Sequence, residues 1–450
     1  MKKTSLIDNY LWKYSAGDRW KLIANDTGNI SQVVVIPACA EKESLFLTLA
    51  SLSQNPPASL ENSFILCVIN NKDNIPPAVI EDNRQTIECL DALIKRNFMM
   101  KFKDKTLQSL ADKVAAGRLK LGYIDASSAG NEITREAGGV GMARKIGMDM
   151  ALKLLRYSSS SPKLIISLDA DTLVSENYLS VIRNHFSSHI KTAIIAYEHQ
   201  LPEIPEEKAA IVCYEIFLRY WVLALQYAKS PWAFHSIGST IVTTTESYLN
   251  VRGMNKREAG EDFYFLNKLA KTSKIHYIKK TCVYPSARPS NRVPFGTGKR
   301  IQRFLSGNRE DEYVLYDPQI FKVLAEWLQF MNESLLQRED EIMEKAKQIH
   351  PLLDAFLIDN KFPLIWSKIR RNAKDEKTLS KQFHDWFDGF KTLKLINYFS
   401  REVYPRINMF EALAKIFSVS EIAGLNIPIN PEIPEIEEQI KILRYLRTIT

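Results

Sequence analysis

Two aspartates, Asp169 and Asp171, follow the apolar run of residues 164–168 with one residue between them. A buried strand that ends in this way directs both carboxylates beyond its carboxyl end, where ligands bind in open α/β sheets. Carboxylate oxygens are the ligands that hard divalent cations such as Mg²⁺ prefer. The pair therefore indicates a cation that holds a diphosphate. Acidic loops are common after strands, so the other motifs of the chain decide its meaning.

A second acidic pair, Glu261 and Asp262, opens a helical stretch directly after Gly260. Transfer of a group to a hydroxyl needs a base that takes the hydroxyl proton as the new bond forms. Either carboxylate has this chemistry. Acids also stabilise the first turn of any helix, so the pair alone fits a capping role as well.

Three arginines carry the forked donor set that suits a diphosphate or the edge of a base. Arg144 stands near the start of a helical stretch, after a glycine-rich approach. Arg288 and Arg292 precede the basic, glycine-containing run of residues 295–300. We expect this run to be a loop that closes over the diphosphate; the alternative is a basic connector to the rest of the chain.

Residues 31–200 show the pattern of a scaffold that could position these groups. Apolar, strand-like runs alternate there with helical stretches, at residues 32–36, 64–69, 119–124 and 164–168. Such alternation predicts an α/β fold, with a mostly parallel sheet flanked by helices on both faces.

Polar residues follow the first two of these strands. Pro37 is expected to end the first strand and to bring Ala38 and Glu41 close to a nucleotide. Asn70 and Asn71 follow the second strand. In open α/β sheets ligands bind outside the carboxyl ends of the strands.

The strand pattern disappears after about residue 310, where helical periodicity and many aromatic residues take over. We therefore expect three parts: an N-terminal arm (1–30), a catalytic α/β domain (31–310) and an all-helical domain (311–450). The aromatic residues of the last part need burial. Its cations Lys391, Lys394 and Arg401 would then lie outside, available to an anionic membrane.

The composition fits a globular protein that binds anions. The 450 residues include 60 basic and 52 acidic ones, a net charge of +8, which suits anionic ligands or surfaces. Five scattered cysteines without metal spacing point to a reducing compartment. The first 20 residues do not read as a signal peptide. The longest apolar stretch, residues 209–228, contains Glu215 and Arg219, so we interpret it as an amphipathic helix of a cytoplasmic protein.

The order of these motifs resembles that of the family 2 glycosyltransferases, which have the GT-A fold with its Rossmann-like nucleotide-binding half. The matching segments are residues 33–41, 51–55, 141–144, 169–171, 253–254 and 260–262. The resemblance covers about residues 31–300. The last 140 residues or so match nothing in that family.

The resemblance implies an inverting, metal-dependent transfer of a sugar, typically a hexose, from a nucleotide sugar to a hydroxyl of a glycan, a lipid-linked acceptor or a small molecule. It makes Asp262, of the pair with Glu261, the base. Asp171 would bind Mg²⁺ or Mn²⁺, and Asp169 would face the metal or the ribose. The nucleotide contacts would come from Pro37, Ala38, Glu41, Asn70, Asn71, Arg144, Arg288 and Arg292.

One departure from the family concerns the base of the nucleotide. Asn70-Asn71 stands where the family usually has an aspartate, and an amide donates as well as accepts. Guanine is therefore as reasonable as uracil. The Gln-x-x-Arg-Trp signature of processive synthases is absent, which favours transfer of one sugar at a time.

Other functions remain open at this point. A retaining transferase shares the fold. A sugar nucleotidyltransferase shares a related sheet, but it normally has a glycine- and arginine-rich loop where this chain has Pro37-Ala38-Cys39-Ala40. A non-catalytic GT-A module that binds a partner is the third alternative. We expect no nucleic-acid partner, and peripheral contact with a membrane is the weaker expectation.

Overall fold

A computed structural model describes residues 3–96, 104–134, 138–158, 161–186, 189–290, 296–422 and 432–450. Tertiary contacts divide these residues into two compact units. The first unit holds residues up to 200 together with 236–286. The second holds residues 201–235, 287–290 and those from 296 onward. The division therefore differs from the boundary that we expected at residue 310, because two segments before it pack with the helical unit.

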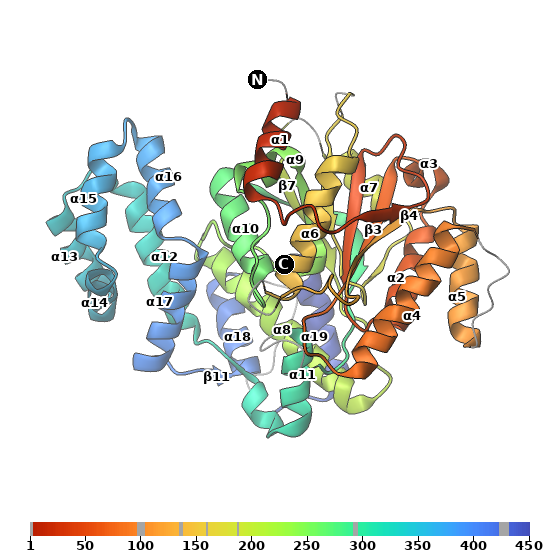
Figure 1. Cartoon of the computed structure of the whole chain (residues 1–450). Helices are drawn as coiled ribbons and strands as arrows, with labels where there is room; N and C mark the ends of the chain where they lie inside the picture. The colour runs from red at the N-terminus through yellow and green to blue at the C-terminus, as the bar shows by residue number, and fades with distance from the viewer. Residues whose placement is uncertain are drawn as a thin grey trace. The chain divides into compact units, whose positions relative to one another are not determined.

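The first unit is built on a nine-stranded sheet in the order β1–β4–β3–β2–β5–β8–β7–β9–β6 (Figure 1). Strands β2, β3, β4, β5, β7 and β9 run in one direction and the other three run against them. The bounds are β1 Leu22–Ala24, β2 Gln32–Ala38, β3 Ser63–Asn70, β4 Lys120–Ala126, β5 Leu164–Ser167, β6 Leu173–Val174, β7 Thr192–Tyr197, β8 Ile241–Thr244 and β9 Ile275–Tyr284. The prediction of an α/β fold with a mostly parallel sheet is confirmed.

Helices flank this sheet in the first unit. Their bounds are α1 Lys3–Tyr14, α2 Lys42–Ser53, α3 Pro57–Leu60, α4 Pro77–Ile94, α5 Lys105–Ala116, α6 Val140–Leu154, α7 Tyr178–His185, α9 Thr245–Asn250 and α10 Glu261–Thr272. Helix α6 packs on β2 and β3 so closely that a Cβ at Gly147 would overlap Val35 and Val68. Strands β2 and β3 are buried along their whole length, as expected of central parallel strands.

The strand order reverses between β2 and β5. From β2 the chain continues to β3 and β4 on one side, and from β5 it continues to the strands on the other side. Open α/β sheets bind ligands at such a switch point, outside the carboxyl ends of the strands. Asp169 and Asp171 lie directly after β5, so the fold places the first acidic pair at this position.

Pro37 lies within β2 rather than at its end, because pairing with β3 continues to Ala38. Pairing with β5 stops earlier, at Val35 opposite Ser167. The last bond on that side runs from the Leu168 N–H to the Val35 carbonyl. In a parallel ladder the residue at 37 would give the next bond, and proline has no N–H to give. The proline therefore ends the β2–β5 ladder and lets β5 turn away toward Asp169.

The second unit is helical, apart from a two-residue antiparallel pair of strands, β10 Val314–Leu315 and β11 Ile407–Asn408. Trp327, Trp366 and Phe383 are fully buried in its core, so the aromatic tail is packed as predicted. Its helices are α8 Pro205–Tyr227, α11 Thr297–Ser306, α12 Pro318–Glu333, α13 Glu339–Ile349, α14 Pro351–Asp359, α15 Phe362–Asn372, α16 Glu376–Trp386, α17 Gly389–Glu402, α18 Met409–Val419 and α19 Ile436–Ile449.

Helix α8 is, among the described residues, the one helix long and apolar enough to cross a membrane by length and composition alone; 67% of its most apolar window is buried within the structure. It carries a fully buried carboxylate, Glu215. This carboxylate accepts hydrogen bonds from Arg219 (Nη2, 3.0 Å) and from Arg447 on α19 (Nε, 2.8 Å). The pairing of Glu215 with Arg219 was expected from their spacing, whereas Arg447 was not.

Replacement of Glu215 should strongly destabilise the second unit. Glu215→Ala would leave the buried guanidinium of Arg219 and the half-buried one of Arg447 without their shared carboxylate, and breaking a buried pair from one side costs about 3–5 kcal/mol. We expect a fall of this size in the free energy of unfolding, measured by urea denaturation. Glu438→Ala, which removes the exposed partner of Lys441, is the matched control and should cost less than about 1 kcal/mol. Equal losses in both variants would contradict the role assigned to Glu215.

Candidate functional site

Arg144, the fifth residue of α6, connects the two acidic pairs. Its Nη2 donates to the Oδ1 of Asp169, and its Nε donates to the Oε1 of Glu261 at 3.1 Å. Its Nη1 donates to the hydroxyl of Ser167 and to the carbonyl of Gly238 at 3.2 Å. Residues from α6, β5, the segment before β8 and α10 therefore meet at one guanidinium.

The guanidinium is buried, with only 4% of the Arg144 side chain exposed. Burial acts to lower its pKa, but the carboxylates of Asp169, Glu261 and Asp262 raise it, so the group stays charged. It fits only because residue 238 is glycine, since a Cβ there would overlap the guanidinium. A buried cation of this kind is stable only while its carboxylate partners are in place.

Glu261 is the first residue of α10 and is itself buried. The helix starts after Gly260, whose φ of 69° is in the left-handed region that favours glycine. Burial raises the pKa of Glu261, while Arg144 acts in the opposite direction. Glu261 is thus bound to Arg144, and Asp262 is the acid of the pair that could act as a general base.

Asp262 is half-buried, and its Oδ1 accepts the N–H of Phe263 at 2.7 Å. Burial, together with the nearby charge of Glu261, raises the pKa of Asp262 to about 7. A carboxyl group that titrates near neutral pH has the property required of a general base. The two acids of the pair thus differ in their contacts: Glu261 is bound to Arg144, and Asp262 accepts the N–H of Phe263.

The Asp169–Asp171 segment is a tight turn that its neighbours hold in place. The N–H of Thr172 donates to the Asp169 carbonyl at 3.2 Å, and the hydroxyl of Thr48 on α2 donates to the Ala170 carbonyl at 2.8 Å. Gln200 donates to the Asp171 carbonyl at 3.3 Å. Both aspartates are only partly buried.

A divalent cation fits this turn if substrate oxygens complete its coordination. Within the described parts of the chain no group of three His, Cys, Asp or Glu side chains could hold a metal. Asp169 already accepts Arg144 through one oxygen, so Asp171 would be the main protein ligand of such a cation. Mg²⁺ commonly binds in this way, through one or two carboxylates plus phosphates and water. A histidine is another common metal ligand, but His276 is on β9, three strands from β5, and its ring is near that of His185.

The residues expected near the nucleotide base are linked by Asn83 of α4, which the sequence analysis missed. Asn83 donates to the Asn70 carbonyl (3.1 Å) and to the Asn71 side chain (2.9 Å), and it accepts the N–H of Ala40 (2.8 Å). It thereby joins the ends of β2 and β3. Asparagine inside a helix is unfavourable for the helix itself. Its presence in the helical stretch is the sequence signal that could have revealed the role of Asn83.

Asn70 has already used its amide hydrogens. Its Nδ2 donates to the carbonyls of Ala38 at 3.0 Å and Val68 at 3.1 Å. These two acceptors fix the orientation of the amide, so the side chain offers a ligand only its oxygen. Glu41, just before α2, is buried at the same edge of the sheet.

The basic residues expected over the diphosphate have a different setting. Arg288 is half-buried and belongs to the second unit, and Arg292 lies outside the described residues. The loop expected at residues 295–300 is helical from residue 297, where α11 begins. Within it, Arg300 pairs with Glu312 at 3.1 Å, which is a structural role.

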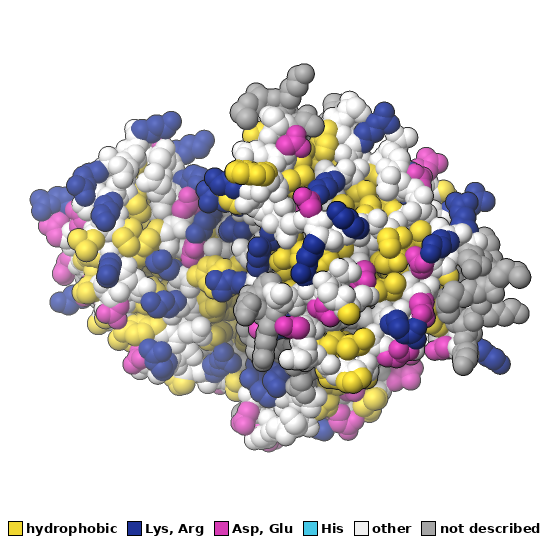
Figure 2. Space-filling view, viewed as in Figure 1, with side chains coloured by type: hydrophobic (Ala, Val, Ile, Leu, Met, Phe, Trp, Pro, Cys, Tyr) yellow, Lys and Arg dark blue, Asp and Glu magenta, His cyan; other side chains and the backbone are white. Residues whose placement is uncertain are grey.

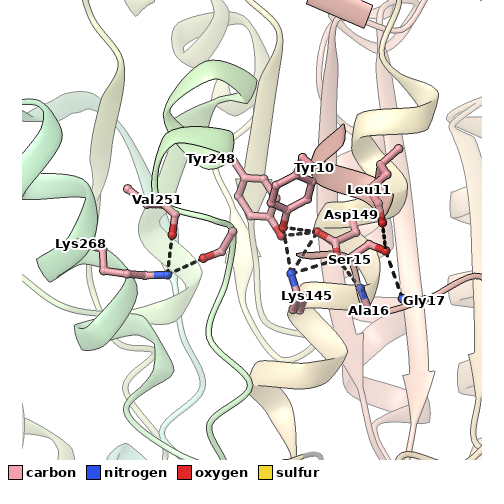
Figure 3. A network of polar contacts seen from close by, with 11 residues as sticks. Tyr10, Leu11, Ser15, Ala16, Gly17, Lys145, Asp149, Tyr248, Val251 and Lys268 are labelled. Carbon is pink, nitrogen blue, oxygen red and sulfur yellow. Dashed lines mark hydrogen bonds and ion pairs between the residues drawn. The ribbon is translucent and has the colours of Figure 1, made fainter. Parts of the chain in front are cut away.

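The N-terminal arm is anchored to the helix that carries Arg144 (Figure 3). Asp149 of α6 accepts the hydroxyls of Tyr10 on α1 (2.8 Å) and Tyr248 on α9 (2.7 Å), and it pairs with Lys145 (3.2 Å). Burial lowers the pKa of Lys145, against the effect of Asp149. Gly253 makes room for the Tyr10 hydroxyl, because a Cβ at residue 253 would overlap it.

A second group of contacts lies on α10. Lys268 of α10 donates to the carbonyls of Val251 (2.9 Å) and Gly253 (2.7 Å), as Figure 3 shows. Burial lowers the pKa of Lys268 to about 8. The arm, expected as residues 1–30, also adds β1 to the edge of the sheet, beside β4. It is therefore an integral part of the first unit.

No known family profile and no curated protein matches this sequence. Among solved structures, the chain is similar to S. aureus TarS 1–349 in complex with UDP-GlcNAc, with 12% identity, a TM-score of 0.36, and coverage of 93% of this chain and 88% of that one. It is also similar to the mannosyltransferase PcManGT from Pyrobaculum calidifontis in complex with GDP-Man and Mn²⁺, with 13% identity, a TM-score of 0.35, and coverage of 85% and 95%. Likeness at this level says nothing of activity, which the site itself must indicate.

Removal of the Tyr10 hydroxyl should loosen the arm. Tyr10→Phe deletes a buried donor and leaves Asp149 with one partner fewer, a loss of about 1–1.5 kcal/mol or roughly tenfold in local opening. We expect the amide hydrogens of α1 to exchange about ten times faster. Trp12→Phe on the same helix, where Trp12 is 86% exposed, is the control and should leave the exchange unchanged. If α1 exchanges equally fast in both variants, the anchor is elsewhere.

Proposed function

We propose that this protein transfers a sugar from a nucleoside-diphosphate sugar to a hydroxyl acceptor. One observation carries the proposal: Arg144 connects the acidic turn at the switch point of the sheet with the acidic start of α10. Asp262, a carboxyl group with a pKa of about 7, directly follows Glu261, so in this proposal it lies beside a site suited to a diphosphate and a cation. Such a pair of sites is what group transfer from a diphosphate to a hydroxyl requires.

The nucleotide would lie at the carboxyl ends of β2 and β3, against Ala38, Glu41 and the Asn70-Asn71 pair. Because the Asn70 amide hydrogens are bound to protein carbonyls, its oxygen would accept a hydrogen bond from the base. Both uracil and guanine have a ring N–H that can donate in this way. The hydrogen bonds of Asn70 therefore support an acceptor, the side-chain oxygen, as the group that faces the base. They do not support donation from the Asn70 amide to the base.

In the transfer step, Asp262 takes the proton of the acceptor hydroxyl. The hydroxyl oxygen forms a bond to the anomeric carbon of the sugar as the bond from that carbon to the phosphate oxygen breaks, and the electron pair goes to the leaving nucleoside diphosphate. Attack opposite the leaving group gives inversion. Asp262 becomes protonated, and the proton is later lost to solvent.

Asp171, with Asp169 beside it, would hold Mg²⁺ or Mn²⁺, which when bound neutralises charge on the diphosphate as a Lewis acid. Arg144 has a positioning role in this proposal. Its N–H groups are directed at Asp169, Glu261, Ser167 and Gly238, so it orients both acidic segments and does not make the direct nucleotide contact that the family resemblance implied.

Loss of the general base, Asp262, should reduce turnover without loss of binding of the nucleotide-sugar donor. Asp262→Asn removes the proton acceptor, and general-base catalysis contributes about 10²–10⁴-fold. We expect turnover of the nucleotide sugar to fall by at least about 10²-fold, while calorimetry shows donor affinity within about threefold of the native protein. The control is Glu258→Gln, an exposed acid in the segment before α10. Loss of donor affinity in Asp262→Asn would make this residue a binding group and overturn its assignment.

The pH profile gives a second test of Asp262. Its carboxyl group must be ionised to accept a proton, and its pKa is about 7. Turnover at saturating substrate should therefore rise tenfold per pH unit below about pH 7 and level off above it. The rise should be absent in Asp262→Asn. A profile that is flat between pH 5.5 and 8 in the native protein would exclude a base with this pKa.

Removal of Asp171 should abolish the effect of metal on nucleotide binding. A ligand that binds only the folded protein raises its melting temperature by mass action. We expect Mn²⁺ to increase the shift produced by UDP or GDP in the native protein but not in Asp171→Ala, with CMP and dTDP completing the panel. Glu176→Ala, an exposed acid five residues on, is the control. A Mn²⁺ effect that survives in Asp171→Ala would overturn the metal assignment.

A further inference from the structure

Exposed apolar side chains gather around α15 in the second unit. Among the described residues, three of the four most exposed large apolar side chains are Leu336 (66%), Leu364 (66%) and Ile358 (56%). Leu364 is on α15 itself, and Ile358 precedes this helix by four residues. Leu336 is beside its other end, because its carbonyl accepts the Nη2 of Arg370 at 3.4 Å.

The outward face of α15 is basic. Lys361, Leu364, Lys368 and Arg371 are all exposed and follow one another at intervals of three or four residues, the spacing of one helix face. Lys374 is exposed just beyond the helix. From residue 360 to residue 374 the sequence has five cations and no acid. The opposite face carries the fully buried aromatics of the helix, Phe362 and Trp366.

Ion pairs hold several cations close to this face. Arg370 of α15 pairs with Glu339, and on the adjacent elements Arg338 pairs with Asp340 and Lys381 with Asp385. In the part of the chain that the structure describes, no ion pair involves Lys361, Lys368, Arg371 or Lys374; the Nε of Arg371 donates to the carbonyl of Ser367 at 3.3 Å. In Figure 2 dark-blue and yellow side chains mix over the region where Figure 1 places α15.

We infer that this face, defined by Lys361, Leu364, Lys368, Arg371 and Lys374, docks on a bilayer surface that contains anionic lipids. Unpaired cations are attracted to the negative headgroups, and aliphatic side chains gain by entering the boundary of the acyl chains. Nucleic acid is the less suitable occupant, because the aromatic side chains of α15, which could stack on bases, are buried.

The sequence pointed to other cations of the tail, and the structure shows that those have partners. The Lys391 ammonium is over the ring of Trp386 at 4.8 Å, Lys394 donates to Asn360 at 2.9 Å, and Arg401 donates to Glu402 at 2.7 Å. The docking face is on a different helix. It lies in the second unit, so it is independent of the proposed transferase site and goes beyond it.

The test is co-sedimentation of the full-length protein with vesicles. We expect binding to vesicles of phosphatidylcholine with 30% phosphatidylglycerol, and little binding to phosphatidylcholine alone. Each cation near an anionic surface contributes roughly fivefold in affinity. The triple variant Lys361→Gln/Lys368→Gln/Arg371→Gln should therefore bind about 100-fold more weakly. The matched control, Lys322→Gln/Lys415→Gln/Lys441→Gln, removes the same charge from exposed positions on α12, α18 and α19 and should bind as the native protein does.

Two further measurements separate docking from general attraction to polyanions. Leu364→Gln should weaken vesicle binding several-fold without altering the melting temperature, because its side chain is exposed. Higher salt should weaken the binding of the native protein, since exposed charges are screened. Equal losses in the two triple variants would overturn the inference. So would vesicle binding that does not depend on anionic lipid, or binding to duplex DNA that the α15 triple variant loses while vesicle binding is unchanged.

Discussion

The first unit depends on a buried positive charge that has to be neutralised. The guanidinium of Arg144 is almost inaccessible to water, and burying a cation is unfavourable unless carboxylates and carbonyls replace its hydration. Asp169 and Glu261 supply that neutralisation from two segments distant in sequence. The end of β5 and the start of α10 are thereby held together, since separating them would expose the charge to an apolar interior.

This constraint explains why two adjacent acids behave differently. Glu261 is directed at the arginine and stays within its field, whereas Asp262 is one residue further along the helix and receives its only described backbone bond from the N–H of Phe263. Burial acts on both carboxyl groups, but only the first has a cation in contact. Burial and the nearby charge of Glu261 raise the pKa of the second to about 7. A single arginine thus separates a structural acid from a titrating one.

Much of the scaffold could be predicted from sequence. Apolar runs indicate buried strands, and the residues that follow such a run lie at the end of a strand, at the edge of the sheet where ligands bind. The positions of Asp169 and of Glu261 at such ends followed directly. The partners of Arg144, the role of Asn83 and the anchoring of Tyr10 on Asp149 could not be predicted, because they join residues far apart in the chain and periodicity does not encode partners. For the same reason α8 was expected in the catalytic domain: its pattern indicated a helix but not which core would bury it.

Three glycines in the first unit make room for contacts around α6 and its anchor. They are Gly147, against Val35 and Val68; Gly238, against the Arg144 guanidinium; and Gly253, against the Tyr10 hydroxyl. Each is a point at which another segment touches α6 or its anchor. A descendant lineage could exchange most surface residues and still fold, but a methyl group at any of these three positions would overlap the group that it faces. Three glycines at these structural positions, together with the arginine, form a fingerprint that could identify remote relatives after overall sequence similarity has been lost.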